Sequence, residues 1–276
     1  MKRKIKWGII STAKIAETDL IPAIKKSKNS ELVAVASRNK DKAAKFAKKN
    51  KIKKFYDSYK KICEDKDIDI IYNPLPNHLH VNSTVNAIKN DKHVLLEKPI
   101  TLKSKEVNII AQAAKKNKKI VKEAFMVRHH PQWQWVKKYI DSNKIGKVNG
   151  ITTLFSYKNL DPKNIRNIKR YGGGGLYDIG CYAIVISRYL LNKEPKKVIC
   201  EANFDKKFKT DNLTSAILDF NGVYSNFIIS TCSTVSQQVL ILGSKKTICI
   251  ENPFNAKAHK ETTVVIYNGN SIYRKD

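Results

Sequence analysis

The first half of the chain alternates short apolar runs with longer segments that repeat apolar residues at helical spacing. The apolar runs cover residues 5–10, 32–37, 68–73, 94–97 and 120–123, and the helical patterns cover residues 13–26, 40–49, 81–89 and 103–116. Each run is bounded by charged residues or proline, as is typical of strands buried on both faces. Strands that alternate with helices of this length predict an α/β fold with a doubly wound, Rossmann-type parallel sheet.

The pattern changes near Gly146. Strand-like runs then dominate, at residues 151–157, 198–204, 215–220, 225–232, 239–242, 247–250 and 262–267, with one helical interruption at 176–191. Asn221-Gly222 between two runs is a strong hairpin signal, and residues 243–246 are expected to form a second turn. We therefore predict an α+β domain with a mostly antiparallel, open sheet. The expected domains are residues 1–123 and 124–276.

The composition suits two domains but does not indicate a nucleic-acid partner. The chain has 276 residues, is 42% hydrophobic and carries a formal net charge of +29. Such a charge is typical of proteins that bind polyanions. However, most of the basic residues are lysines spread along the whole chain, whereas recognition of phosphates and bases more often uses clustered arginine. We interpret the charge as a general lysine bias on solvated surfaces and expect no nucleic-acid partner.

The cysteines and the N-terminus favour a soluble, cytoplasmic protein. The five cysteines are widely spaced and form no CxxC pair, which is typical of reduced thiols. The apolar run after the basic start is too short for a secretory signal, and no later stretch is long enough to span a membrane. The histidines lack supporting carboxylates or thiols at metal-ligand spacing, so we expect no metal.

Small residues follow the first predicted strand and open the first predicted helix. The candidate cofactor turn consists of Gly8, Ser11, Thr12, Ala13, Lys14 and Ile15, with Ala16 behind it. Small side chains here allow the backbone to approach a pyrophosphate, which the helix N-terminus then binds. The motif is not a complete G-x-G-x-x-G, because Ser11 and Ala13 stand where glycine is usual. For this loop alone, an ordinary tight connection is an equal alternative.

The end of the second predicted strand favours NADP. The strand ends in Ala36-Ser37-Arg38. An NAD site usually has an acidic residue at this place, which bonds the ribose 2′-hydroxyl. A hydroxyl and a guanidinium instead fit the 2′-phosphate of NADP. Ser37 and Arg38 are also compatible with a plain loop, and NAD is the alternative cofactor.

Several motifs in a specific order resemble those of the Gfo/Idh/MocA oxidoreductases. The similarity is greatest to the branch of glucose–fructose oxidoreductase, dihydrodiol dehydrogenase and NADP-dependent xylose dehydrogenase, and it runs from about residue 4 to residue 254. Besides residues 7–16 and 36–38, the motifs are Tyr72-Asn73-Pro74-Leu75-Pro76-Asn77-His78-Leu79-His80, Glu97-Lys98-Pro99, residues 123–131, Asn164-Ile165-Arg166 and residues 173–182.

The resemblance implies roles for individual residues. Glu97-Lys98-Pro99 would border the nicotinamide. Lys98 would be a catalytic or substrate-orienting residue, and the Lys98–Pro99 peptide bond is a candidate for the cis form. Pro74, Asn77 and His80 would line the cofactor. Tyr182 matches an acid/base tyrosine, and Asp178 matches the aspartate four residues before it. Arg166 is either a contact to substrate hydroxyls or an ordinary salt-bridging residue.

Oxidation of a carbinol requires transfer of a hydride to the nicotinamide and removal of the hydroxyl proton. Asp178 and Tyr182 are spaced i, i+4 in a helical pattern and therefore share a face. A cationic Lys98 beside the phenol would favour the tyrosinate. Our hypothesis is that Tyr182 exchanges the proton while Lys98 polarises the substrate oxygen, with reversed roles as an alternative. From its apolar surroundings alone, Tyr182 also fits a core aromatic position.

Other expectations concern the partners of the chain. The chain ends at Asp276, soon after Phe254, whereas members of the family usually continue for several tens of residues, so we expect a shortened second domain. In the family the open sheet face usually packs on a second subunit, which implies a homodimer or homotetramer. The expected substrate is a sugar, polyol or diol. Alternatives are an inactive dinucleotide- or sugar-sensing regulatory protein of the same fold and a nucleic-acid-binding protein.

Overall fold

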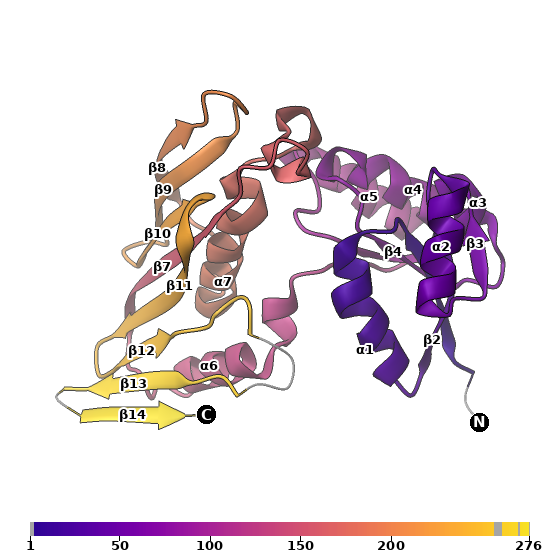
Figure 1. Cartoon of the computed structure of the whole chain (residues 1–276). Coiled ribbons are helices and arrows are strands. Elements are labelled where there is room, and N and C mark those ends of the chain that lie inside the picture. Colours follow the sequence, from indigo (N-terminus) through magenta and orange to yellow (C-terminus); the bar gives the residue numbers. More distant parts are fainter. Residues whose placement is uncertain (1–2, 257–260, 270, 276) are drawn as a thin grey trace. The chain divides into compact units, whose positions relative to one another are not determined.

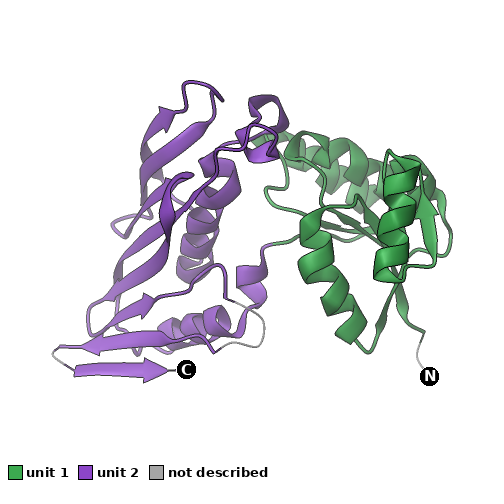
Figure 2. Ribbon diagram, viewed as in Figure 1, with its two compact units in different colours: residues 1–124 green, residues 125–276 purple. Residues whose placement is uncertain are grey.

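The computed structural model describes residues 3–256, 261–269 and 271–275. The chain divides into two compact units, unit 1 (Met1–Ala124) and unit 2 (Phe125–Asp276), which are coloured separately in Figure 2. Among the described residues, no helix combines the length and the apolar character that crossing a bilayer requires. Each unit has its own sheet and its own hydrophobic core.

The described part of unit 1 contains a six-stranded sheet in the order β3-β2-β1-β4-β5-β6 (Figure 1). Its strands are β1 (Ile5–Ile10), β2 (Ser30–Ala36), β3 (Lys54–Tyr56), β4 (Ile70–Asn73), β5 (His93–Leu96) and β6 (Val121–Glu123). Every neighbouring pair runs parallel. The strand order reverses between β1 and β4, and ligands of such sheets bind at the carboxyl ends beside this switch point. The predicted parallel sheet is confirmed.

Helices cover both faces of this sheet. They are η1 (Ala16–Leu20), a π-helical turn that continues into α1 (Ile21–Lys26), then α2 (Lys40–Asn50), α3 (Tyr59–Glu64), the short η2 (Asn77–Leu79), α4 (His80–Lys89) and α5 (Ser104–Lys116). One apolar cluster joins the sheet to α1 and α2 through Ile21 and Ala47. The other joins it to α3, α4 and α5 through Ile62, Ile88 and Ile110. The apolar strands are thereby buried on both sides, which explains their unbroken hydrophobic runs.

The sequence did not predict β3 and α3, which form one edge of unit 1. A carboxylate that follows α3 ties them together. Asp65 accepts hydrogen bonds from Lys54 Nζ at 3.1 Å, the Tyr56 hydroxyl at 2.8 Å and the Asp67 N–H at 2.9 Å. Burial works to raise the pKa of Asp65, but the donated hydrogen bonds outweigh it, and the pKa lies below its usual range.

The described part of unit 2 contains an eight-stranded sheet in the order β14-β13-β12-β11-β7-β10-β9-β8. Its strands are β7 (Val148–Lys158), β8 (Lys197–Phe204), β9 (Asp211–Asp219), β10 (Tyr224–Ser230), β11 (Cys232–Gly243), β12 (Thr247–Ile250), β13 (Val264–Asn268) and β14 (Ser271–Lys275). Neighbours are antiparallel except β7 and β10, which run parallel. The predicted, mostly antiparallel sheet is confirmed.

Both predicted turns of unit 2 are also confirmed. Asn221 and Gly222 join β9 to β10 with φ of +65° and +85°. Two left-handed residues in succession are what a two-residue hairpin turn of the favoured twist requires. Between β11 and β12, the Gly243 N–H donates to Lys246 O at 2.9 Å.

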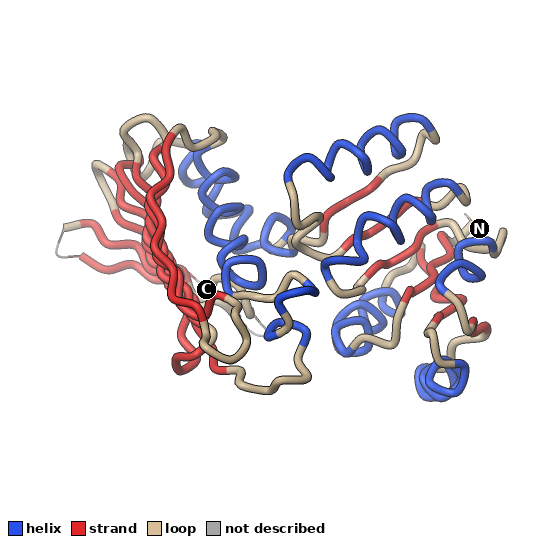
Figure 3. The backbone as a smooth tube through the Cα atoms, turned by 90° about the horizontal axis from the view of Figure 1, so that it is seen from above, coloured by secondary structure: helices blue, strands red, loops and turns tan. Residues whose placement is uncertain are grey.

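Helices cover one face of the second sheet, which Figure 3 shows on edge with helices along one side. They are α6 (Pro131–Asp141) and α7 (Cys181–Leu191), with the short turns η3 (Met126–His129), η4 (Ile165–Asn167), η5 (Lys169–Tyr171) and η6 (Leu176–Gly180). In α6, Trp133 is fully buried and donates Nε1–H to Pro253 O at 2.7 Å. Residues along β7, β9 and β10 alternate between buried and exposed, so the sheet has an inner face and an outer face.

We predict that Asp65→Asn lowers the free energy of unfolding at pH 7 by on the order of 1 kcal/mol, because Lys54 and Tyr56 lose a charged acceptor. A carboxyl with a lowered folded-state pKa contributes stability above its unfolded pKa, near 3.9, and loses it as the pH falls through the folded value. The difference between wild type and variant should therefore shrink below about pH 4. Urea denaturation followed by circular dichroism at pH 7 and pH 3 measures it.

The control is Asp57→Asn, which breaks the exposed pair with Lys61 and should change stability less. Equal stabilities of wild type and Asp65→Asn at pH 7 would contradict the account of this edge.

Candidate active site

The turn after β1 contains most of the residues predicted to hold a cofactor. Ser11 has a φ of +118°, a conformation that normally favours glycine. Its N–H donates to Ala36 O at 2.9 Å, so the turn after β1 is bonded to the end of β2. Thr12 and Ala13 are half-buried, while Lys14 and Ile15 are exposed at the start of the helical segment.

Gly8 is separate from this turn. It lies buried within β1, and a Cβ at this position would come within 2.9 Å of the Ile68 side chain and 3.0 Å of the Ile71 side chain. The missing side chain therefore makes room for core packing behind the sheet. The expected cofactor contact of Gly8 stays a prediction, and its place within β1 is explained by core packing.

Ser37 and Arg38 follow β2 directly, beside the turn at Ser11. The Ser37 N–H donates to Tyr56 O at 3.0 Å, and its hydroxyl oxygen accepts from the Asn39 N–H at 3.2 Å. A hydroxyl can accept one hydrogen bond and donate another, so Ser37 keeps a donor for a ligand. Arg38 is exposed. The end of β2 thus holds a fixed hydroxyl, on a residue that is 7% exposed, beside an exposed cation.

A buried asparagine fixes the connection that follows β4. Asn73 is fully buried, and its Nδ2 donates to Ser83 Oγ at 2.8 Å and Thr84 Oγ1 at 3.1 Å, both on α4. Its Oδ1 accepts from the Leu75 N–H at 3.3 Å. Pro74 between them is buried, and Asn77 begins η2. The loop expected to line a cofactor is therefore anchored to α4.

Two glutamates hold the backbone around Lys98. Tyr72 donates its hydroxyl to Glu97 Oε1 at 2.5 Å, and the Lys98 N–H donates to Glu97 Oε2 at 3.3 Å. The Ile100 N–H donates to Glu123 Oε1 at 2.7 Å. The Lys98–Pro99 peptide is cis. Lys98 thus lies just beyond β5, on a backbone segment that is held from both sides.

His80, which was expected to line the cofactor, is completely buried. Its Nδ1 lies 2.8 Å from Pro99 O, and its Nε2 lies 2.8 Å from Leu75 O. Burial lowers the pKa of His80 despite these carbonyl partners. Both ring nitrogens are therefore engaged by the backbone of unit 1.

In unit 2, Asp178 accepts two hydrogen bonds at one oxygen. The Tyr157 hydroxyl donates to Oδ2 at 2.6 Å, and Arg166 Nε donates to the same atom at 2.8 Å. Burial raises the pKa of Tyr157 and the charge of Asp178 raises it further, so the phenol stays protonated and remains a donor. Burial works to lower the pKa of Arg166, but Asp178 outweighs it and the pKa is raised.

Tyr182 occupies the core aromatic position that its apolar surroundings allowed. It is 8% exposed, and its ring meets Phe125 and Phe155 edge-on at 5.5 and 6.0 Å between centroids, with Phe254 at 5.4 Å. Its phenol also acts electrostatically on Arg166. The ring is therefore part of the core of unit 2.

The glycines at 172–175 are closely packed. A Cβ on Gly173 would overlap the Arg166 carbonyl oxygen, and the Gly174 N–H donates to that oxygen at 2.9 Å. Gly174 has a φ of +125°, and a Cβ there would overlap the Asp211 carboxylate. The lack of side chains at these glycines therefore allows the Arg166 turn to pack closely against the start of η6, the element that contains Asp178.

Sequence reasoning missed Tyr157 and Asp211. Asp211 accepts hydrogen bonds from the Leu176 N–H at 2.6 Å and the Thr214 hydroxyl at 3.0 Å, and it thereby fixes the start of η6. The sequence offered only weak signals for these two residues: Asp211 is one acidic residue among many, and Tyr157 stands at the end of a predicted strand. Neither identified its partner.

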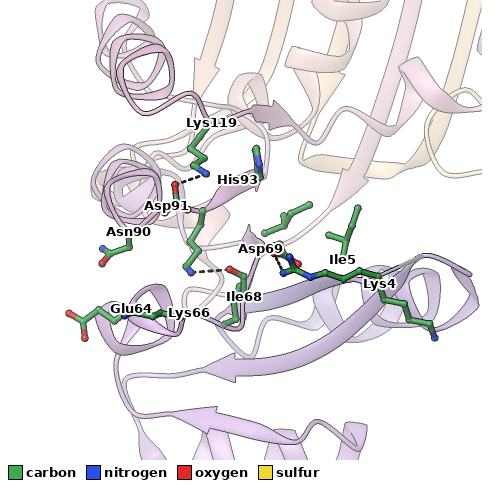
Figure 4. Close-up of a pocket in the computed structure, with 13 residues that line it drawn as sticks. Lys4, Ile5, Glu64, Lys66, Ile68, Asp69, Asn90, Asp91, His93 and Lys119 are labelled. Atoms are coloured by element: carbon green, nitrogen blue, oxygen red, sulfur yellow. Dashed lines mark hydrogen bonds and ion pairs between the residues drawn. The ribbon is translucent and has the colours of Figure 1, made fainter. Parts of the chain in front are cut away.

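Figure 4 shows a hollow of about 800 Å³ at the opposite edge of the first sheet, near the amino ends of β1, β4 and β5. Several of its charges are paired within the protein. Arg3 pairs with Asp69 at 2.6 Å and Lys119 pairs with Asp91 at 2.5 Å. Its lining contains none of the predicted site residues. Within the part of the chain that the structure describes, no three His, Cys, Asp or Glu side chains are grouped to hold a metal ion.

Comparisons with known proteins agree with this arrangement. Residues 5–125 match the Gfo/Idh/MocA oxidoreductase family with its NAD-binding Rossmann fold, and residues 133–249 match the Gfo/Idh/MocA C-terminal domain. The chain is 38% identical to the uncharacterized oxidoreductase ORF334 of Rhizobium meliloti, over 97% of this chain and 80% of that protein. It is 30% identical to D-xylose 1-dehydrogenase (NADP(+)) 2 of Haloferax volcanii, over 84% of this chain and 71% of that protein.

A solved structure is similar to the whole fold. It is KijD10, a 3-ketoreductase from Actinomadura kijaniata, in complex with NADP and TDP-benzene. The TM-score is 0.93 at 25% identity, over 99% of this chain and 84% of that one.

Gly173→Ala should destabilise the protein, because the added methyl group overlaps the Arg166 carbonyl and forces two backbone segments apart. Overpacking of this kind costs about 1–3 kcal/mol, which lowers the melting temperature by several degrees. Thermal unfolding monitored by circular dichroism measures the shift. The control is Gly222→Asn, at a turn where a Cβ has nothing within 4 Å and where asparagine tolerates the left-handed conformation. If Gly173→Ala and Gly222→Asn have the same melting temperature, the close packing described around Gly173 is wrong.

Proposed function

The chain belongs to the Gfo/Idh/MocA family of oxidoreductases, and we propose that it transfers a hydride between the nicotinamide of NADP and a carbinol or carbonyl carbon of a sugar, polyol or diol. The observation that carries the proposal is the cation Lys98, held by hydrogen-bonded backbone at the carboxyl edge of a parallel sheet. Nicotinamide enzymes bind their cofactor at this edge. The D-xylose dehydrogenase among the relatives supports a sugar substrate.

The end of β2 supports NADP over NAD. Ser37 offers a hydroxyl donor and Arg38 an exposed guanidinium, and both fit a phosphate dianion. No carboxylate stands at residues 36–38 to repel a phosphate or to bond a ribose 2′-hydroxyl. The NADP-bound KijD10 and the NADP-dependent D-xylose dehydrogenase agree with this choice.

The bound cofactor would accept or donate the hydride. We propose that Lys98 polarises the substrate oxygen and that Tyr182 exchanges the hydroxyl proton. Arg166 acts on the Tyr182 phenol and stabilises negative charge that develops there during proton transfer. Asp178 holds Arg166 in place through Nε, and Tyr157 holds Asp178. Arg166 is therefore a positioning and electrostatic group as well as a candidate substrate contact.

We also propose that the protein forms a homodimer or homotetramer through the outer face of the second sheet. Large apolar side chains gather there on neighbouring strands. Ile228 on β10 pairs with Leu154 on β7, and Ile199 on β8 pairs with Ile217 on β9. These side chains are between 36% and 68% exposed. Exposed apolar side chains gathered on neighbouring strands are typical of a protein interface.

To test the function, the wild-type protein is mixed with NADP or NAD and a panel of aldoses, polyols and diols, and the absorbance of the reduced cofactor is followed. Lys98→Met and Tyr182→Phe should each lower kcat by about 100-fold or more, because each removes a group that acts on the reacting oxygen. Binding of NADPH, measured by fluorescence, should change little. The exposed residues Lys89 and Tyr273 supply controls, as Lys89→Met and Tyr273→Phe.

Near-normal kcat in both site variants with tight NADPH binding would eliminate the assigned roles. Tight NADPH binding by a wild-type protein that turns over no substrate would favour the inactive, sensing alternative instead.

The interface is tested with the double variant Ile199→Lys and Ile228→Lys. Size-exclusion chromatography with light scattering should show a dimer or tetramer for the wild type and a monomer for the variant, because two lysines cannot be buried without partners. Ile120→Lys, at an isoleucine that is 67% exposed in unit 1, is the control and should keep the wild-type mass. A monomeric wild type at micromolar concentration would refute the proposed interface.

A further inference from the structure

His80 joins two connections that leave the carboxyl edge of the first sheet. Leu75 O belongs to the connection after β4, and Pro99 O belongs to the connection after β5. Each carbonyl oxygen lies 2.8 Å from one nitrogen of the imidazole, which is completely buried. Pro99 follows Lys98 directly. The ring therefore bridges the loop beside the proposed cofactor and the backbone that carries the proposed catalytic cation.

A carbonyl oxygen only accepts hydrogen bonds, so the ring must act as the donor. A neutral imidazole donates to one of the two carbonyls, and an imidazolium donates to both. In either state the ring is confined between the two segments. Because the ring is completely buried, loss of the donor would leave a buried carbonyl without this partner, which is costly.

The bond to Pro99 O completes the restraint on the Lys98 segment. The Lys98 N–H is held by Glu97, and the Ile100 N–H is held by Glu123. Proline has no N–H, so its carbonyl is the only backbone group through which residue 99 can be held. His80 supplies that hold, from the first residue of α4.

We infer that His80 is a positioning residue for Lys98: its imidazole holds the Pro99 carbonyl against the Leu75 turn and so fixes the backbone from which the Lys98 side chain extends. His80 itself touches neither substrate nor cofactor in this role. The inference rests on the proposed function of Lys98.

The same unit offers a matched comparison for a purely structural role. Lys92 is 4% exposed, and its Nζ donates to Asp65 O at 2.8 Å and Ile68 O at 2.9 Å. Like His80, it bridges two backbone carbonyls from a buried position. It does so at the opposite edge of the sheet, beside the hollow of Figure 4, where no proposed catalytic residue is attached.

The experiment compares His80→Leu with Lys92→Met in the full-length protein. Both should lower the melting temperature, because each removes a buried side chain that donates to backbone carbonyls. Only His80→Leu should speed hydrogen–deuterium exchange in peptides covering residues 97–103. With the best substrate of the panel, His80→Leu should lower kcat at least tenfold and change the NADPH dissociation constant less than threefold. Lys92→Met should keep kcat within twofold of wild type.

His80→Gln provides the rescue, because its side-chain NH2 group carries two donors for carbonyl oxygens. We expect its kcat and its exchange at 97–103 to lie closer to wild type than those of His80→Leu. If His80→Leu does not fold, the same comparison is made between His80→Gln and Lys92→Met, with slower turnover and faster exchange at 97–103 expected for His80→Gln.

The inference is overturned if the histidine variant matches Lys92→Met in both kcat and exchange at 97–103. Failure of the proposed function has a different signature. A wild type without any turnover refutes that function, and the exchange data still decide whether His80 holds the backbone at Lys98.

Discussion

The hydrogen bonds that hold residues 97–100 determine where the proposed cation of this protein acts. Three side chains supply them from three separate elements. Tyr72 on β4 bonds Glu97, His80 on α4 meets Pro99 O, and Glu123 on β6 accepts from the Ile100 N–H. Because each of these elements is part of the packed sheet unit, Lys98 extends from a rigid scaffold. Functional groups are positioned accurately when a second layer of contacts fixes them in this way.

In unit 2, close backbone packing holds the proposed functional residues in place. The closely packed glycines bring the Arg166 turn against the start of η6, and Asp211 fixes that start through the Leu176 N–H. Asp178 then receives Tyr157 and Arg166 at one oxygen. Tyr182 has its ring in an aromatic cluster, so packing restricts the ring, and its phenol acts electrostatically on Arg166.

Features that depend on local pattern were predictable from the sequence, and features that depend on tertiary contact were not. The alternation of strands and helices predicted the parallel sheet, and Asn221-Gly222 predicted a hairpin because its turn needs two left-handed residues. The three residues of β3 are too few for a periodic signal, and their support comes from Asp65. A motif histidine does not reveal which way its ring points, so the burial of His80 required the structure. Tyr157 meets its partner only through the position of β7.

The most direct test of the central claim, an NADP site at the carboxyl edge of the first sheet, measures the dissociation constants of NADPH and NADH by fluorescence titration. Wild type and Arg38→Leu are compared at one ionic strength, because charge contacts to phosphate depend on salt. The account predicts that wild type binds NADPH at least tenfold more tightly than NADH. It also predicts that Arg38→Leu loses most of this preference and keeps its affinity for NADH. A wild type that prefers NADH, or a variant that loses both cofactors equally, would contradict it.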